Sequence, residues 1–356
     1  MLIASRRFSH AWGCSMSDLT APLVSICIPT YNAATTIRET LSSIVNQTYK
    51  NLDIQIVDNA STDDTLRVVS EFYDHRITIH RHATNVGGEG NFNRCIQLAT
   101  GKYTAIYHAD DLYEPEIVQR QVDFLERHID AGAVFTEANL IDEVGKAFGA
   151  LKLPKELSST GFVFKFSQLF KVILHRRNFF VCPSAMVRTQ IYQNEVKFWR
   201  GDLFKSSADL DVWLRISKIY PVGFLLGPLM SYRISKFQFS SGVRNHTEKW
   251  DFHLVTDYYL AQENVQAIIN DVDRMHYRWL ERTDKVRRAI NLFLLNRISE
   301  AHRLCDDVIS LDALRAAIDT RVGLLTLLAG VYIRTCVAFR LQVAGLKFLK
   351  LIKKLS

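Results

Sequence analysis

The feature that most constrains the fold is a regular alternation of short apolar strands and amphipathic helices in the first third of the chain. An apolar run at residues 24–28 predicts a buried strand, and residues 34–47 place apolar side chains at helical spacing. The pattern then repeats, with strands predicted at 52–57, 77–79 and 102–107 and helices at 61–72, 91–99 and 115–127. Such alternation with short connections is typical of a mainly parallel sheet covered by helices on both faces, so we predict an α/β fold.

Polar side chains follow three of these strands. Tyr31 and Asn32 come after the first strand, Asp58 ends the second, and Asp110 and Asp111 follow the fourth. Ligands of such sheets bind beyond the carboxyl ends of the strands, so these loops are expected to meet at one cleft. The loop after the first strand reads Pro-Thr-Tyr-Asn and lacks the glycine pattern of a dinucleotide-binding turn, which argues against a dehydrogenase.

The charge of the chain is concentrated at one end. The net charge is +7, and residues 321–356 contain seven basic residues and no acidic ones, so the rest of the chain is electrically balanced. Nucleic-acid-binding domains more often spread positive charge over a folded face, so we expect no nucleic-acid partner. With 48% hydrophobic residues, the chain has the composition of a folded protein rather than a disordered one.

Cysteines and the N-terminus indicate a reducing compartment. The six cysteines contain no Cys-x-x-Cys pair, which argues against a disulfide framework and a structural zinc site. No apolar segment typical of a signal peptide follows Arg6 and Arg7. We therefore expect a cytoplasmic protein whose residues 1–20 form a disordered extension.

Four short motifs together resemble those of family 2 glycosyltransferases. They lie at residues 29–32, 58–63, 85–88 and 109–111, in the order and spacing of that family. The resemblance covers residues 23–241. It implies a GT-A fold (Rossmann-like, with flanking helices) over residues 21–245, with a donor half at 21–135 and an acceptor half at 136–245. A helical extension would follow at 246–320.

The resemblance also implies a donor site with a metal ion. Asp110 matches the last residue of the family's Asp-x-Asp triplet, which implies that it holds Mn or Mg on the donor diphosphate. His108 stands at the first position of the triplet, either as a donor contact or as a packed histidine. Asp58 would accept a hydrogen bond from uracil, or else cap a turn. The other implied donor-binding residues are Pro29, Tyr31, Asn32, Asn85, Gly87, Asp111 and Arg233, with turn, core or ion-pair roles as alternatives.

Residues 206–215 resemble the family segment that carries the catalytic base. Asp209 aligns with that base and Asp211 with a second acid, while Ala208 replaces the usual glutamate. The resemblance implies that Asp209 takes the proton of the acceptor hydroxyl. For both acids the alternative is a structural role in the first turn of a helix, and for Asp211 the two interpretations are evenly balanced.

These residues lead to one functional hypothesis and one alternative. The hypothesis is an inverting, non-processive glycosyltransferase of cell-envelope polysaccharide synthesis, which moves a sugar from a nucleotide-sugar donor, preferably a UDP-sugar, to a glycan or lipid-linked acceptor. Processive relatives carry a Gln-x-x-Arg-Trp motif, and here Met275 precedes Arg278 and Trp279 where glutamine would stand. The alternative is a catalytically inactive GT-A domain that serves as a membrane-bound binding or scaffold protein.

The basic segment at residues 321–356 is predicted to be an amphipathic, membrane-associating tail. Lysines at 347, 350, 353 and 354 recur at helical spacing, as in helices that lie on anionic membranes. Arg334 interrupts the apolar run at 323–339, so we expect no membrane span. The tail would hold the protein peripherally at the inner face of the cell membrane. A domain-capping helix or a dimer contact is the alternative.

Overall fold

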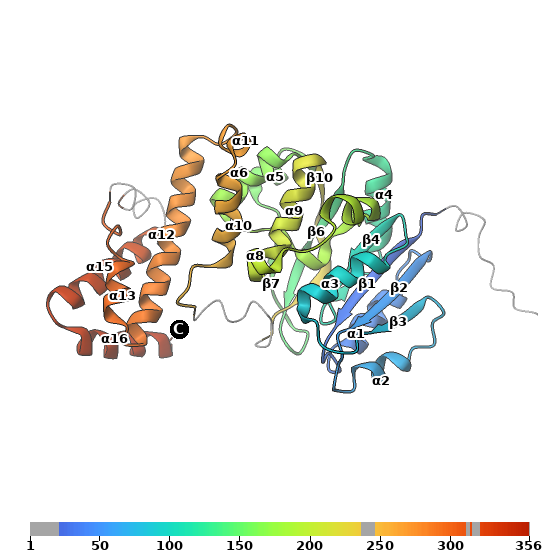
Figure 1. Cartoon of the computed structure of the whole chain (residues 1–356), viewed down its shortest axis with the longest axis horizontal. Helices are drawn as coiled ribbons and strands as arrows, with labels where there is room; N and C mark the ends of the chain where they lie inside the picture. The colour runs from blue at the N-terminus through green and yellow to red at the C-terminus, as the bar shows by residue number, and fades with distance from the viewer. Residues whose placement is uncertain (1–20, 236–245, 311–313, 315–320, 356) are drawn as a thin grey trace, which may run out of the picture.

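The computed structural model describes residues 21–235, 246–310, 314 and 321–355. The chain forms a sheet with helices on both faces, followed by a helical arm that projects from one end (Figure 1). The predicted extension at residues 1–20 and the predicted boundary at residue 245 lie outside the described residues.

One ten-stranded sheet, of order β3-β2-β1-β4-β9-β6-β10-β5 with β7 on β6 and β8 on β10, forms the body. The strands are β1 Val24–Thr30, β2 Leu52–Asp58, β3 Ile77–Arg81, β4 Tyr103–Ile106, β5 Leu112–Tyr113, β6 Ala133–Ile141, β7 Ala147–Leu151, β8 Val163–Phe164, β9 Met186–Arg188 and β10 Val222–Arg233.

The α/β prediction is confirmed, but the sheet is mixed rather than mainly parallel. Strands β3, β2, β1 and β4 are parallel neighbours, as predicted. The three-residue strand β9 then enters between β4 and β6 and runs antiparallel to both. Strands β5, β7 and β8 also pair antiparallel, and β6 and β10 run parallel. The antiparallel half arises because these short strands return as hairpins or edge pieces rather than through helical crossovers.

Helices cover both faces of the sheet. Those of the body are α1 Ile37–Val45, α2 Thr65–Ser70, α3 Gly87–Leu98, α4 Ile117–Arg127, α5 Lys155–Ser158, α6 Phe166–Arg176, α7 Thr189–Ile191, α8 Gly201–Phe204 and α9 Ala208–Ile219, with short 3-10 or π turns at Cys182–Ser184, Tyr192–Val196 and Lys205–Ser207. Along β1, Ile26 and Ile28 belong to the core beneath α1 and α4, whereas Cys27 belongs to the core beneath α3, α6 and α9. This alternation explains why the strands are apolar on both faces.

The helical arm follows the body. Its helices are α10 Asp251–Leu260, α11 Glu263–Gln266, α12 Asp271–Leu294, α13 Ile298–Arg303, α15 Arg321–Ala338 and α16 Gln342–Leu355. Helix α12 begins at a capping box, in which the Asn270 side chain accepts from the Asp273 N–H. The N-terminal part of α12 packs against α6 of the body, and its C-terminal part shares a separate core with α13 and α15.

Helix α15 passes the test for a membrane span by length and composition. Its mean hydropathy is 1.4 over 18 residues, and 28% of that stretch is buried in the protein. No other helix in the described part of the chain is both long enough and apolar enough. Because of Arg334 we expected no span at residues 323–339, whereas the described helix is long and apolar enough for one by length and composition alone.

Candidate active site

Three loops meet at the carboxyl edge of the parallel half of the sheet. Asn32, in the loop after β1, accepts from the Thr62 N–H at 2.9 Å, and its own N–H donates to Ser61 Oγ at 3.0 Å. Thr36 Oγ1 donates to the carbonyl of Ala109, in the loop after β4, at 2.9 Å. The predicted convergence of these loops is therefore confirmed.

Asp58 anchors the loop after β2. It is fully buried, accepts from Thr30 Oγ1 at 3.2 Å and from the Ser61 N–H at 3.0 Å, and lies 3.6 Å from Arg81 Nε. These contacts agree with a role in shaping the turn. The implied contact with a uracil base stays a prediction.

Asn59, which was not among the predicted site residues, links this loop to α3. Asn59 Nδ2 donates to Asn85 Oδ1 at 2.9 Å and to the Gly87 carbonyl at 3.1 Å, while Asn59 Oδ1 accepts from the Val86 N–H at 2.8 Å. Gly87 has a φ of +77°, which favours glycine. An amide at the second position of the 58–63 motif was the available signal, because it offers both a donor and an acceptor.

Two other predicted donor residues have different surroundings. Pro29 lies inside β1, opposite Val57 of β2. Tyr31 is 50% exposed at the mouth of the loops, so it is not a core tyrosine. Donor contacts by both residues stay predictions.

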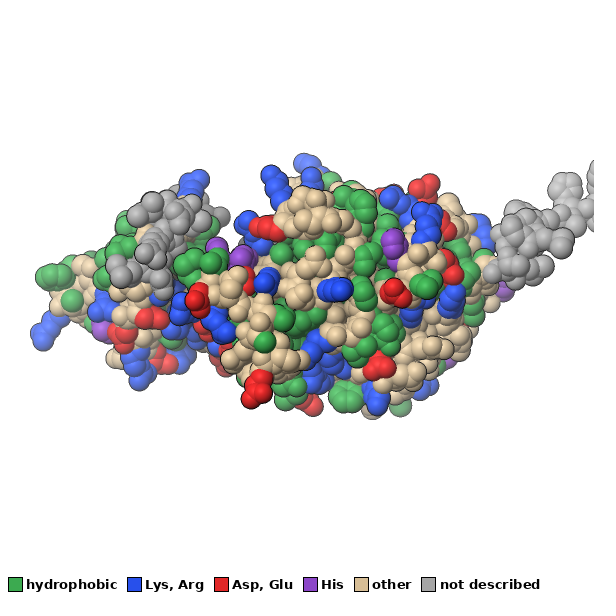
Figure 2. Space-filling view, turned by 90° about the horizontal axis from the view of Figure 1, so that it is seen from above, with side chains coloured by type: hydrophobic (Ala, Val, Ile, Leu, Met, Phe, Trp, Pro, Cys, Tyr) green, Lys and Arg blue, Asp and Glu red, His purple; other side chains and the backbone are tan. Residues whose placement is uncertain are grey.

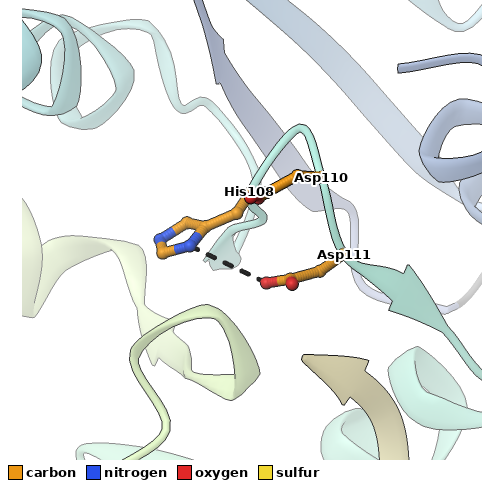
Figure 3. Close-up of side chains that lie close together, drawn as sticks. All are labelled: His108, Asp110 and Asp111. Carbon is orange, nitrogen blue, oxygen red and sulfur yellow. Dashed lines mark ion pairs between the residues drawn. The ribbon is translucent and has the colours of Figure 1, made fainter. Parts of the chain in front are cut away.

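The turn after β4 gathers three side chains that could ligate a metal (Figure 3). One ligand atom each from His108, Asp110 and Asp111 lies within 4.8 Å of the others. Asp111 is fully buried, and its Oδ2 has no hydrogen-bond partner among the described residues, although His108 Nδ1 lies 3.7 Å away. His108 Nε2 is also buried, again with no hydrogen-bond partner in the described part of the chain. We refer to these three residues as the metal turn.

The electrostatics of the metal turn fit a divalent cation. Burial, and then the charge of Asp110, raise the pKa of Asp111 well above its usual range, although the backbone N–H of Arg233 opposes the shift. Burial lowers the pKa of His108, which favours a neutral imidazole with a free lone pair. Two carboxylates and an imidazole are a donor set that suits Mn²⁺ and accommodates Mg²⁺ less readily. We predicted Asp110 alone as the metal ligand, and the structure places His108 and Asp111 beside it.

Arg233 braces the metal turn. Its side chain is almost completely buried, and Nε donates to the Asp110 carbonyl at 2.8 Å. Its other guanidinium nitrogens donate to Glu39 Oε2 and to the carbonyls of Asp142 and Glu143. These contacts give Arg233 a positioning role at the end of β10, and its implied contact with the donor stays a prediction.

Asp209, the predicted general base, lies at the start of α9. It is half-buried in the first turn of α9, where Oδ1 accepts from the Leu210 N–H at 2.7 Å. Burial raises the pKa of Asp209 to about 6, although hydrogen bonds from Leu210 and Asn178 oppose the shift.

The metal turn and Asp209 share a half-buried neighbour, Tyr232 of β10. Burial raises the pKa of Tyr232, and the charges of Asp111, Asp110, Cys182 and Asp209 raise it further. Burial and then the charges of Asp209 and Asp111 also raise the pKa of Cys182, so both carboxylates lie in the neighbourhood of these two residues.

Asp211 differs sharply from Asp209. It is fully buried and accepts from Arg200 Nε at 2.9 Å, from Arg215 Nε at 3.0 Å and from the Tyr259 hydroxyl at 3.0 Å. Its carboxylate oxygens are occupied by these protein groups. The contacts favour the structural alternative for Asp211.

Comparisons with known proteins agree with the motifs. The model of the family described as "Glycosyl transferase family 2" matches residues 25–194. An uncharacterized glycosyltransferase of Methanocaldococcus jannaschii, MJ1057, is 30% identical over 224 residues, which are 62% of this chain and 73% of that protein. The chain belongs to glycosyltransferase family 2. An uncharacterized glycosyltransferase of Haemophilus influenzae is 29% identical to this family 2 enzyme over 76% of the chain and 84% of its own length.

A solved structure confirms the fold of the family 2 enzyme. TarS residues 1–349 from S. aureus, crystallised in complex with UDP-GlcNAc, superpose with a TM-score of 0.59, covering 89% of this chain and 91% of that one. The two sequences are 15% identical, so the likeness concerns the fold alone. The GT-A prediction is thereby confirmed, together with the C-terminal helical region.

Proposed function

We propose that this glycosyltransferase is an inverting, non-processive enzyme that transfers a sugar from a nucleotide-sugar donor to a glycan or lipid-linked acceptor in cell-envelope polysaccharide synthesis. The observation that carries the proposal is the metal turn together with Asp209, whose pKa is raised to about 6 and whose charge reaches the same neighbours, Tyr232 and Cys182. A UDP-sugar is the donor we favour, because the 58–63 motif resembles the uracil-binding motif of the family. The UDP-GlcNAc complex of the structurally similar TarS agrees with that choice.

His108, Asp110 and Asp111 would hold the divalent cation, Mn or Mg, on the donor diphosphate. When bound, such a cation supplies a Lewis acid that offsets the charge developing on the leaving diphosphate. Arg233 keeps the turn in place through the Asp110 carbonyl, and Thr40 does so by donating to the Asp111 carbonyl at 2.8 Å. The protein thus fixes the backbone of the turn from two sides and leaves the buried side-chain atoms for the metal.

Asp209 acts on the acceptor. Its carboxylate accepts the proton of the acceptor hydroxyl while that oxygen forms a bond to the anomeric carbon of the donor sugar. The bond between that carbon and the diphosphate oxygen breaks at the same time, so the nucleoside diphosphate leaves and the configuration inverts. A carboxylate with a pKa near the working pH is well matched to this transfer, because it is ionised and still basic.

The raised pKa predicts an acidic limb in the pH profile. Below about pH 6 Asp209 becomes protonated and cannot accept a proton, so kcat should fall roughly tenfold per pH unit as the pH decreases. Release of nucleoside diphosphate from a UDP-sugar, with water as the acceptor and saturating Mn²⁺, measures this limb between pH 5 and 8. Circular dichroism at each pH verifies that the protein stays folded. A flat profile over this range would contradict the role of Asp209.

The same assay addresses the alternative of an inactive binding domain. Such a domain would bind the nucleotide-sugar without releasing nucleoside diphosphate at any pH. The names of the related proteins, all glycosyltransferases, favour the enzyme.

A further inference from the structure

Helix α15 has one face that packs against the protein and one that does not. Gly323, Thr326, Gly330, Ile333 and Cys336 recur every three or four residues and are buried. At Gly330 the fit is so close that a Cβ atom would lie 2.3 Å from the Val308 side chain. This face attaches α15 to the core that it shares with α12 and α13.

The opposite face of α15 is apolar and exposed. It carries Leu324, Leu325 and Leu328, each between 45% and 57% exposed. Single exposed apolar side chains are normal on a protein surface, but a contiguous group of large ones marks a contact site. Figure 2 shows hydrophobic side chains at this end of the arm, next to basic ones.

Arg334 does not interrupt this exposed face. Its Nη1 donates to the carbonyls of Cys305 at 3.1 Å and Asp306 at 2.8 Å, in the turn after α13. The guanidinium is therefore directed at the protein. Its charge therefore does not lie among the exposed leucines of α15.

Helix α16 adds basic side chains beside this face. The chain turns at Arg340, which has a φ of +55°, and the Tyr332 hydroxyl of α15 donates to the Gly345 carbonyl of α16 at 3.1 Å. Leu346 and Leu349 pack toward the arm core. The outward side carries Val343, Lys347, Phe348, Lys350 and Leu351, all exposed.

The surface has no acidic residue of its own. Residues 321–356 contain none, and Arg321, Arg340, Lys347 and Lys350 are exposed. Asp312 and Asp319 lie outside the described residues. Of the described carboxylates before them, Asp307 accepts from Lys285 at 2.8 Å, and Asp306 lies 3.8 Å from both His302 and Arg334. Leucines and lysines without acids complement an anionic lipid surface.

We propose that one surface, which we call the arm face, binds an anionic membrane by lying on it. The arm face consists of Leu324, Leu325, Leu328, Val343, Lys347, Phe348, Lys350 and Leu351. Its apolar side chains enter the boundary between headgroups and acyl chains, and its lysines contact the headgroups. This proposal is independent of the donor chemistry, although it places the enzyme where a lipid-linked acceptor would be.

A transmembrane position of α15 fits less well. Its 18 residues span about 27 Å at 1.5 Å per residue, which is short of the roughly 30 Å of a hydrocarbon core. Crossing the bilayer would also require the buried face to leave α12 and would draw Arg334 away from its two carbonyl partners. An interfacial position keeps all of these contacts.

Vesicle cosedimentation of the full chain tests the proposal. The wild-type protein should bind vesicles of phosphatidylcholine with 30% phosphatidylglycerol and should bind pure phosphatidylcholine vesicles weakly. The K347Q/K350Q variant should lose about thirtyfold in binding to the anionic vesicles, at about 1 kcal/mol per lysine. The L324Q/L325Q/L328Q variant should lose on the order of a hundredfold, because each half-exposed leucine contributes roughly half of its full burial energy.

A control variant and a salt wash complete the vesicle experiment. V144Q/F148Q replaces apolar side chains at the β6–β7 hairpin that are more exposed than the arm-face leucines, and it should bind vesicles like the wild type. All variants should keep their unfolding temperature and their release of nucleoside diphosphate. Release of the wild-type protein by 0.5 M salt supports the interfacial position, whereas retention after salt and alkaline washing overturns it in favour of a span. Equal binding by the wild type and both arm-face variants, or a dimer that the leucine variant abolishes, also overturns it.

Discussion

Replacement of Asp209 with asparagine is expected to lower kcat by about 10²–10⁴-fold while leaving donor affinity nearly unchanged. The amide keeps the size of the side chain but cannot accept the proton of the acceptor hydroxyl. Because burial disfavours the ionised form of Asp209 and raises its pKa to about 6, the neutral variant should fold at least as stably as the wild type near pH 7.5. Single-turnover release of nucleoside diphosphate, together with calorimetric donor titration, measures both quantities.

Asp211, two residues further along α9, provides the matched control. Asp211→Asn leaves the guanidinium groups of Arg200 and Arg215 without their buried carboxylate, so we expect a loss of about 3–5 kcal/mol in the free energy of unfolding. Asp209→Asn should therefore lower kcat, whereas Asp211→Asn should lower the free energy of unfolding. Loss of donor binding in Asp209→Asn would show that Asp209 belongs to the donor site and is not the base.

Replacement of Asp110 with asparagine is expected to weaken Mn²⁺ binding by about 100-fold or more and to remove the metal-dependent part of nucleotide affinity. The carboxylate is a charged ligand, and even neighbours of metal ligands typically contribute 10–100-fold to metal affinity. The electron paramagnetic resonance signal of free Mn²⁺ measures the metal directly, in the absence and presence of UDP. Asp123→Asn, at a half-exposed carboxylate on α4, is the control and should bind Mn²⁺ like the wild type.

The same titration tests whether His108 is a ligand. His108→Ala should weaken Mn²⁺ binding, whereas His108→Asp should retain it, because a carboxylate can replace the imidazole at this position of the turn. If both His108 variants bind Mn²⁺ like the wild type, the imidazole is a packed side chain and the ligand set must be revised.

The parallel half of the fold could be predicted because its signal is local. Strands β1, β2 and β4 are largely apolar and buried, and each is followed by a helical period, which the sequence displays directly. The antiparallel half could not, because strand β9 has only three residues and its place between β4 and β6 depends on contacts far along the chain. A pattern of three residues has no measurable period.

In the candidate site, too, the sequence reveals local features, whereas contacts between distant residues appear only in the folded chain. Asp209 and Asp211 lie in one helical turn and look alike in the sequence, but they lie on different sides of α9. The groups that donate hydrogen bonds to Asp211 include Tyr259, 48 residues away, which only the folded chain brings near. Likewise, apolar residues occur on every side of α15, so the sequence does not show which side is buried. Packing against α12 and α13 distinguishes the buried side from the exposed one.

In the proposed function, the loops at the carboxyl edge of the sheet bind a nucleoside diphosphate together with a divalent cation. The unfolding temperature of the wild-type protein, measured with UDP, GDP, dTDP and CMP in the presence of Mn²⁺ or of a chelator, tests it most directly. At about 100 times Kd a ligand stabilises the folded state by roughly 2.7 kcal/mol, enough for a rise of several degrees. We predict that rise for UDP with Mn²⁺ and little or none with the chelator. If no nucleotide raises the unfolding temperature, or if the rise is the same with and without the metal, the proposed metal-dependent nucleotide site is wrong.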